Sequence, residues 1–511
     1  MFKKHPKGLL AAALANMGER FGFYTMMAIL TLFLMSKFGL SETQAGYIYS
    51  AFYFSIYILA FVGGLIADKT KNFKKTILVG LILMAAGYLV IAIPTPTPVP
   101  ASQYTLFLLL SCFGLLIIAF GNGLFKGNLQ ALVGQMYDNP QYAKMRDSGF
   151  SLFYMFINVG AIFAPIFAVA VRNWWVNSHG FAYNANLSEL CNGFLQGTLS
   201  ADGQASFQTL AATVGYTGAD FTAFANEYLN IFVTGFHYAF GVAIFAMLIS
   251  LVIYVVNKKK FPNPSVAEKE AYGVANDGGM SAQEVKQRLY ALFAVFAVVI
   301  FFWFSFHQNG LTLTYFAKDF TDASNINIHL GFTRLIGVEL FQSVNPFFVV
   351  FLTPVVLAVF GALRARGKEP STPRKIAVGM CIAATAYALM TIGSMGLPSK
   401  GEVVGMGGLP DADKVTPFLL IGTYFILTVA ELFISPLGIS FVSKVAPPKY
   451  QGMMQGLWLC ATAVGNSLLF IGAIFYEKLS LSTTWMLFVV VCLISMTLML
   501  AMLKWLERIA K

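Results

Sequence analysis

The chain has 511 residues, of which 57% are hydrophobic and only 11% are charged, and its formal net charge is +11. Its mean hydropathy of +0.69 excludes an ordinary soluble globular protein. Stretches of about 20 mostly apolar residues recur along the whole chain, without the period-two alternation of a β-barrel, and this pattern predicts many membrane-spanning helices. We therefore expect an all-α membrane protein.

Twelve apolar stretches are long enough to span a bilayer. They cover residues 12–36, 43–67, 76–95, 104–134, 149–171, 233–256, 289–315, 336–362, 376–395, 415–442, 453–475 and 484–503. With the N-terminus inside, most of the 34 Lys and Arg residues fall in cytoplasmic segments, so the positive-inside rule predicts that both termini are cytoplasmic. The inner loops then account for the positive net charge, and no nucleic-acid partner is expected.

Polar segments divide the chain. Residues 257–288 contain prolines and a glycine pair and separate six apolar stretches from six, so we expect two six-helix bundles, 1–256 and 289–511, joined by a cytoplasmic linker. A second polar region, at about 172–232, is predicted to lie outside. It could be a small cap or a gate, but a solvated loop is the favoured interpretation.

The five cysteines predict no disulfide framework. Cys112, Cys381, Cys460 and Cys492 lie in apolar stretches, and only Cys191 lies in the predicted external region. No external pair is therefore present to oxidise.

The first apolar stretch contains charged residues in the segment NMGERFGFY. Asn16, Glu19, Arg20 and Tyr24 recur at spacings of three and four, so they share one helix face. Because a charge near the bilayer centre costs roughly 2.5–3.5 kcal/mol, this face must meet partners or water inside the bundle. The alternative is a neighbouring pair that neutralises itself for packing alone.

Other stretches carry polar or aromatic residues at helical spacing. These are Asn122 and Lys126, Tyr154 and Asn158, Trp303 and His307, Asn345 before a proline, Glu431 and Ser435, and the aromatic residues Tyr24, Tyr57 and Trp458. Together they predict a polar cavity with aromatic walls, in which Arg20 and Lys126 would attract a carboxylate and Glu431 an ammonium group. Such a cavity suits a zwitterion, although a bundle in which these groups pair only with one another would have the same sequence pattern.

Several motifs resemble a known transporter family. The segment GGLIADKTKNFKK, with Gly64, Asp68 and Lys69, resembles the conformational loop signature of the major facilitator superfamily. LFYMFINVGA at residues 152–161 resembles the FYxxINxG signature of the proton-dependent oligopeptide transporter family within it. GERFGFY, GNGLFKGN, FQSVNPFF and AELFISPLGISFV resemble further motifs of that family, so the resemblance covers nearly the whole chain.

The resemblance implies two six-helix bundles and proton-coupled import of di- and tripeptides by alternating access. It also implies a substrate site formed by Arg20, Tyr24, Tyr57, Lys126, Asn158, Trp303, Asn345, Glu431 and Trp458. The counterparts of Arg20 and Lys126 attend the peptide carboxylate, and that of Glu431 attends its amino end. The central linker is too short for the two additional helices of many bacterial members.

Four residues depart from the family pattern. Asn16 replaces a glutamate, Phe23 a tyrosine, Met27 an arginine and His307 a glutamate. In the family the residues at positions 27 and 307 can form an interhelical salt bridge, so both of its ends are missing together and no buried charge is stranded. Glu19 is then the expected coupling residue. His307 could replace the lost glutamate as a proton site, or it could be a neutral hydrogen-bonding wall; the sequence does not decide between the two.

We expect a multi-pass protein of the inner or plasma membrane that works as a monomer, with peptides, protons and bilayer lipids as its partners. No metal-ligand cluster, nucleophile elbow or phosphate loop is found, so an enzyme, a cofactor and a metal are not expected. Two alternatives stay open, namely transport of another small solute such as an amino acid, nitrate or a peptide-like metabolite, and a receptor that binds peptide without transporting it.

Overall fold

The structure is a computed structural model that describes residues 5–70, 72–137, 141–142, 145–262, 280–324, 326–447 and 450–509. Within these ranges, twelve helices or consecutive helical segments are long and apolar enough to cross a membrane. The prediction of twelve spanning segments is therefore confirmed. The middle of the predicted linker, residues 263–279, lies outside the described residues.

The first six spans are long single helices. They are α1 (Leu9–Phe38), α2 (Glu42–Thr70), α3 (Phe73–Ala92), α4 (Tyr104–Met136), α5 (Arg146–Ser178) and α8 (Phe221–Asn257). A short 3-10 turn, η2 (Ala101–Gln103), leads into α4, and another, η4 (Lys258–Lys260), follows α8. These helices pack mainly on one another, and we call them the first half.

The second half contains broken spans. Its helices are α10 (Ala282–Phe306), α11 (Thr312–Phe320), α12 (Val344–Ala365), α13 (Thr372–Gly393), α15 (Pro417–Val445), α16 (Gln451–Ser467), α17 (Leu469–Lys478) and α18 (Leu481–Ile509). The 3-10 segment η5 (His307–Gly310) separates α10 from α11, and η6 (Val338–Ser343) precedes α12. Two short strands, β1 (Ile328–His329) and β2 (Arg334–Leu335), pair antiparallel before η6.

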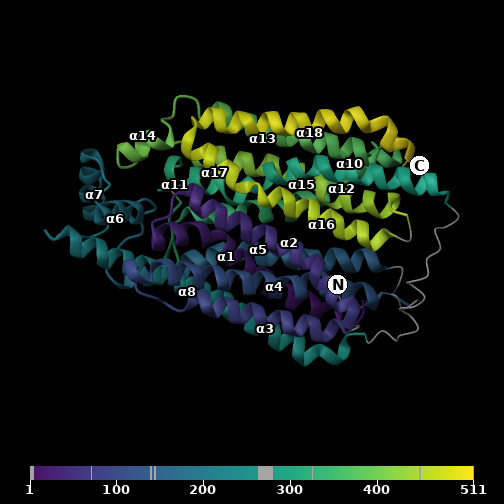
Figure 1. Cartoon of the computed structure of the whole chain (residues 1–511), viewed down its shortest axis with the longest axis horizontal. Coiled ribbons are helices and arrows are strands. Elements are labelled where there is room, and N and C mark those ends of the chain that lie inside the picture. Colours follow the sequence, from purple (N-terminus) through teal and green to yellow (C-terminus); the bar gives the residue numbers. More distant parts are fainter. Residues whose placement is uncertain are drawn as a thin grey trace.

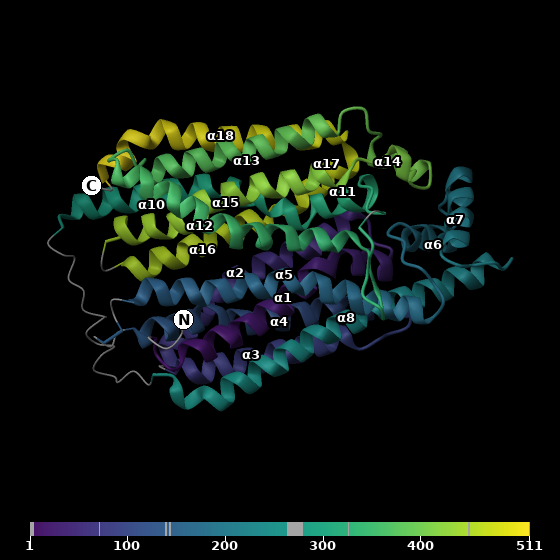
Figure 2. The same cartoon turned by 180° about the vertical axis from the view of Figure 1, so that it is seen from behind.

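The two ends of the molecule differ (Figure 1). The start of α1 and the end of α18 lie at one end, and the short helices α6 (Leu187–Gln196), α7 (Ala201–Thr213) and α14 (Lys400–Gly405) lie at the other. Following the predicted orientation, we call these the inner and the outer end. The view from behind shows the same arrangement, with the helices running between the two ends (Figure 2).

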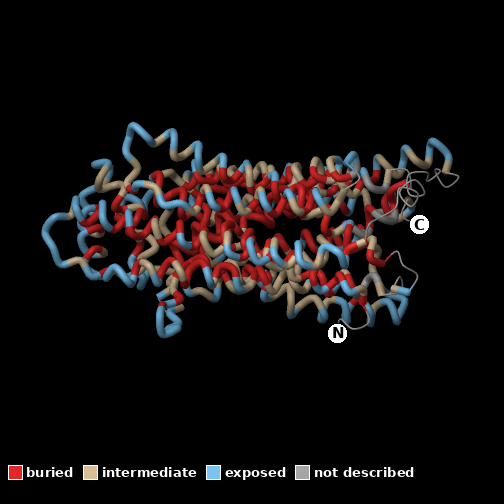
Figure 3. Tube along the Cα trace, turned by 90° about the horizontal axis from the view of Figure 1, so that it is seen from below, coloured by how far each residue is buried: buried red, intermediate tan, exposed pale blue. Residues whose placement is uncertain are grey.

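Close packing within the first half rests on glycine. A Cβ at Gly63 of α2 would collide with the backbone of Gly123 in α4, and a Cβ at Gly80 of α3 would lie 2.6 Å from the carbonyl oxygen of Gly121. Small residues allow this approach between membrane helices, where van der Waals packing drives association. Buried residues accordingly run through the interior between the helices (Figure 3).

The two halves meet along two lines. On one, α2 packs against α16 and α17; on the other, α5 packs against α12 and η6. At the outer end of the second line, Arg172 of α5 and Glu339 of η6 form a fully buried ion pair. Asn173 donates from Nδ2 to the carbonyl oxygens of Arg334 and Ile336, each at 2.8 Å.

The segment predicted to be a solvated external loop, at about 172–232, is helical over most of its length, although many of its residues are exposed. Helix α5 continues to Ser178 and α8 already begins at Phe221, while α6 and α7 occupy much of the segment between them. The polar residues Arg172 and Asn173 resemble the end of a span in sequence, but both are buried against the second half. Their partners replace the water that a helix end would otherwise require.

Candidate functional site

The charged pair of α1 lies inside the first half. The guanidinium of Arg20 donates to both carboxylate oxygens of Glu19, with Nε–Oε2 and Nη2–Oε1 distances of 2.6 Å. Asn122 of α4 donates a further hydrogen bond of 2.6 Å from Nδ2 to Oε1. Both charged residues are buried. As predicted, Glu19 and Arg20 face away from lipid, and they form an ion pair to which Asn122 adds a hydrogen bond.

A second cation lies close to this pair. The ammonium group of Lys126 lies 4.5 Å from the centre of the Tyr57 ring, which is a cation–π contact. Lys126 is partly buried and forms no salt bridge with any of the described residues. Lys126 also interacts electrostatically with Arg20 and Glu19. Arg20 in turn lies over the ring of Phe23, at 4.6 Å. The structure therefore brings the two predicted cations together on one side.

The second half contributes an anion. Glu431 of α15 accepts a hydrogen bond of 3.0 Å on Oε2 from Nδ2 of Asn345, which also donates to Oγ1 of Thr428 at 2.9 Å. Both Tyr24 and Tyr57 of the first half interact electrostatically with Glu431 as well as with Arg20. Both tyrosines therefore lie within electrostatic range of a cation of the first half and of the carboxylate of the second.

His307 occupies the break between α10 and α11. Its Nδ1 lies 2.5 Å from Oδ1 of Asn466, and its ring stacks on Trp303 at 5.0 Å and contacts the ring of Tyr53 from the first half at 4.8 Å. Among the described charged groups, the cation Lys126 is the one that interacts electrostatically with His307. An imidazolium would therefore have no counter-ion among the described neighbours, which favours a neutral hydrogen-bonding ring.

The other predicted site residues lie further along the helices. Tyr154 bonds with Gln130, one turn from Lys126, and Asn158 donates to the carbonyl oxygen of Tyr154 at 3.3 Å. Ser435 is one turn from Glu431 and half-buried.

Trp458 belongs to a different layer of the bundle. Its ring packs against Gly438 and contacts Phe296 at 6.1 Å. Gly438 lies seven residues beyond Glu431, or roughly 10 Å along a helix, so Trp458 lies toward the inner end from that carboxylate.

The residues that depart from the family pattern are buried. Asn16 and Met27 are 4% and 8% exposed, and Nδ2 of Asn16 has no hydrogen-bond partner in the described structure. Met27 is therefore an apolar side chain of the core, and the paired loss at positions 27 and 307 stays a prediction.

The predicted conformational loop begins inside a helix. Helix α2 continues to Thr70, so Asp68 does not end the helix as expected, because the basic turn starts only after it. Lys69 is exposed, and a Cβ at Gly64 would meet no atom within 4 Å. The side chain of Asp68 lies outside the described part of the structure.

Two residues of the site were missed from the sequence. Tyr53 contacts His307 across the two halves, and Asn466 binds His307. Tyr49, Tyr53 and Tyr57 recur every four residues on α2, and this spacing is a signal that could have identified Tyr53. Asn466 is a lone amide in an apolar stretch, so only the tertiary structure reveals its partner.

Comparisons with known proteins agree with this geometry. The family model described as the POT family matches residues 74–275 and 275–486. A peptide transporter of Yersinia enterocolitica is 31% identical over 91% of this chain and 87% of its own length. The dipeptide and tripeptide permease A of Escherichia coli is 25% identical over 91% of this chain and 83% of its own length.

A solved structure has the same fold. The crystal structure of a peptide transporter POT in complex with sulfate aligns with a TM-score of 0.71 at 24% identity and covers all of this chain and 96% of the other. Twelve candidate spans and transporter relatives define an integral membrane protein of the transporter class with a major facilitator fold. The chain belongs to the POT family.

Proposed function

We propose that this protein imports di- and tripeptides by proton symport, through alternating access between its two halves. The observation that carries this proposal is that Tyr24 and Tyr57 of the first half lie within electrostatic range of both Arg20 and the Glu431 carboxylate of the second half. Lys126 adds a second cation, which lies over the Tyr57 ring. A peptide carboxylate would bind the cation, and its ammonium group would bind the anion. Membership of the POT family and relatives named as peptide transporters and permeases support the same substrate class.

Such a peptide would bridge the two halves. Because each end of the zwitterion satisfies a charge in a different half, binding favours the state in which the halves lie close together. The amide of Asn345 holds the Glu431 carboxylate in position, and the aromatic rings offer apolar contacts that accept different side chains. The charged groups would therefore select the two ends of the peptide backbone, and the aromatic rings would accept different peptide side chains.

Proton coupling would act through Glu19. Both carboxylate oxygens of Glu19 bind Arg20 in the present state. Protonation of Glu19 would remove one charge of the pair and free the guanidinium to attract the peptide carboxylate, so that a proton and a peptide favour each other's binding. One positive charge moving inward through 100 mV supplies roughly 2.3 kcal/mol for accumulation.

Uptake into proteoliposomes tests substrate and coupling together. With an inward proton gradient, we expect labelled dialanine to accumulate and the lumen to acidify, and a Lys126→Met variant should lose most of the uptake. A Lys286→Met variant, which removes an exposed lysine of α10, is the matched control. Equal uptake without any gradient and without acidification would indicate facilitated diffusion, and dialanine that neither enters nor competes would indicate another cargo.

Replacement of His307 tests the proton site. Because the described neighbours of His307 include no counter-ion, we expect a His307→Gln variant to keep the pH dependence of wild-type uptake, at a rate reduced by the loss of the contact with Tyr53. The measurement is the initial rate of dialanine uptake between pH 5 and pH 8. A pH profile that becomes flat would instead assign the coupling proton to His307.

We further propose a location in the inner or plasma membrane, with both termini on the cytoplasmic side and a monomer as the working unit. The 257–288 segment would then be a cytoplasmic linker between the two bundles. Both chain ends lie at the same end of the helices, which supports their location on the same side of the membrane, and the positive-inside rule assigns that side to the cytoplasm.

A further inference from the structure

The outer segment between α5 and α8 is attached firmly to the first half. Oγ of Ser188 in α6 lies 3.0 Å from Oγ of Ser36 in α1, and Nδ2 of Asn192 donates to the carbonyl oxygen of Ser36 at 2.9 Å. Phe207 of α7 stacks on Phe194 of α6, with ring centres 4.7 Å apart, and contacts Phe224 of α8. The hairpin of α6 and α7 therefore moves with the first half.

The same hairpin is bound to the second half. Ser200 donates from Oγ to the carbonyl oxygen of Gly405 at 2.6 Å, and Ser206 donates to that of Met406 at 3.0 Å. Both acceptors belong to α14 or the residue directly after it. Backbone acceptors at the end of a short helix lack intrahelical partners, so these two hydroxyl groups fix the hairpin at a defined place.

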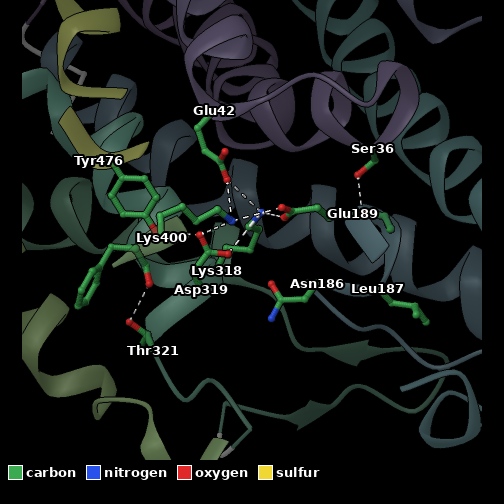
Figure 4. Close-up of polar contacts among 12 residues, drawn as sticks. Ser36, Glu42, Asn186, Leu187, Glu189, Lys318, Asp319, Thr321, Lys400 and Tyr476 are labelled. Carbon is green, nitrogen blue, oxygen red and sulfur yellow. Dashed lines mark hydrogen bonds and ion pairs between the residues drawn. The ribbon is translucent and has the colours of Figure 1, made fainter. Parts of the chain in front are cut away.

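An ion cluster also joins the hairpin to the second half (Figure 4). The Glu189 carboxylate of α6 lies 2.6 Å from Nζ of Lys318 and 3.4 Å from Nζ of Lys400. Although burial raises it, the two ammonium groups hold the pKa of the Glu189 carboxyl well below its usual range, so this group is ionised at neutral pH.

Further charges complete this cluster. Lys400 lies 2.9 Å from Glu42 of α2 and 3.0 Å from Asp319, whose Oδ2 also accepts a hydrogen bond from Tyr476 at 2.8 Å. Three carboxylates thus surround two ammonium groups, with Glu42 and Glu189 on the first half and both lysines on the second. Outward opening must separate these opposite charges.

We propose that the α6–α7 hairpin is a clasp that holds the outer end closed by docking on α14 and Lys318 of the second half. It is continuous with the first half and makes polar contacts to the second half in the present structure, and opening of the outer end would break them. The clasp would set the balance between outward-open and outward-closed states, and this role rests on the alternating access of the proposed function.

Two substitutions separate a clasp from a passive cap. Glu189→Gln removes the only carboxylate that α6 contributes to the described cluster, yet leaves Glu42 and Asp319 facing the two lysines, with balanced charge. A passive cap predicts no opening in this variant. A clasp predicts a shift toward the open state, roughly 2- to 10-fold in the ratio of open to closed, because a charged hydrogen-bond acceptor whose side chain is 38% exposed is lost.

Lys400→Met removes a positive charge from the cluster instead of a negative one. It leaves three carboxylates facing one lysine, so the closed state should lose more than in Glu189→Gln. Glu227→Gln is the matched control, because Glu227 is an exposed glutamate of the same outer region on α8. It should leave the equilibrium unchanged.

The readout is the distance between the two halves, measured by electron spin resonance. Spin labels are attached at Asn177→Cys and Phe418→Cys, in a protein whose Cys112, Cys381 and Cys460 are replaced by serine. Both label positions are exposed at the outer end, on α5 and α15. A pair at Asn177→Cys and Asn226→Cys, within the first half, should keep its distance. Unchanged 177–418 distances in both Glu189→Gln and Lys400→Met overturn the clasp, and a longer distance in each supports it.

A reversible lock gives an independent test. Oxidation of a Ser206→Cys and Met406→Cys pair, placed where the clasp meets α14, should stop dialanine uptake, and reduction should restore it. Full uptake by the oxidised protein would overturn the proposal. Because the distance measurement needs no substrate, the clasp can stand even if wild-type protein fails to carry dialanine, an outcome that would refute the proposed cargo alone.

Discussion

Replacement of Glu431 by glutamine is expected to lower dialanine uptake roughly 10- to 100-fold, since a charge-assisted hydrogen bond to the peptide ammonium group is lost. Glutamine keeps the size of the side chain and can keep the hydrogen bond with Asn345, which is 3.0 Å long in the wild type. The loss should therefore fall on substrate binding. The measurement is the concentration dependence of uptake, in which the half-saturating concentration should rise.

A blocked substrate supplies the control for this experiment. N-acetyl-dialanine has no ammonium group, so any weak inhibition that it causes should be equal in wild type and Glu431→Gln. A Glu284→Gln variant removes a carboxylate from a surface ion pair with Arg288 at the inner end and should behave as wild type. If Glu431→Gln lowered inhibition by both peptides equally, the carboxylate would be structural and the assignment of the amino end would fail.

Loss of either partner of the Arg172–Glu339 pair is expected to destabilise the outward-closed state by about 3–5 kcal/mol, because the remaining charge stays buried without a counter-ion. Both side chains are fully buried, one in each half. We expect Arg172→Met and Glu339→Met each to lengthen the 177–418 distance at the outer end, since opening lets the stranded charge meet water.

The double variant decides whether charge is the cause. Arg172→Met with Glu339→Met leaves no stranded charge, so the outer end should close again, at least in part. Arg172 also lies 4.2 Å from the centre of the Tyr183 ring. Because the double variant lacks this contact as well, its outer end should close less completely than that of the wild type. A double variant that opens as far as the two single changes combined would show that the pair contributes through packing alone.

Hydropathy predicts most of this fold because lipid imposes it. A spanning segment must satisfy its backbone internally and must be about 20 residues long, so twelve apolar stretches are sufficient to identify twelve spans. The same reasoning fails beyond the bilayer. Helix α6 carries Leu187, Leu190, Cys191 and Phe194 at helical spacing, but its polar flanks resemble a loop, and no bilayer rule requires it to dock on α14.

The candidate site shows a similar division. Spacing on one face predicts that Glu19 and Arg20 point inward, and the cost of unpaired charge predicts that each has a partner. It does not predict which partner, and the pairing of these adjacent residues with Asn122 follows only from how α4 lies beside α1. The positions of Lys318 and Lys400 are even less predictable. In the sequence each resembles an ordinary basic residue near a helix end, and only the tertiary structure shows that they lie in one cluster.

The contrast between the interfaces within and between the halves has a thermodynamic consequence. Inside the first half, backbones touch at glycines such as Gly63 and Gly123, and this close van der Waals contact is lost if they part. At the outer end, the halves are held by carboxylates, ammonium groups and hydroxyl groups that water can solvate as they separate. We therefore expect each half to move as a rigid body, and water that enters at the outer end to solvate the separated polar groups and so lower the free-energy cost of opening.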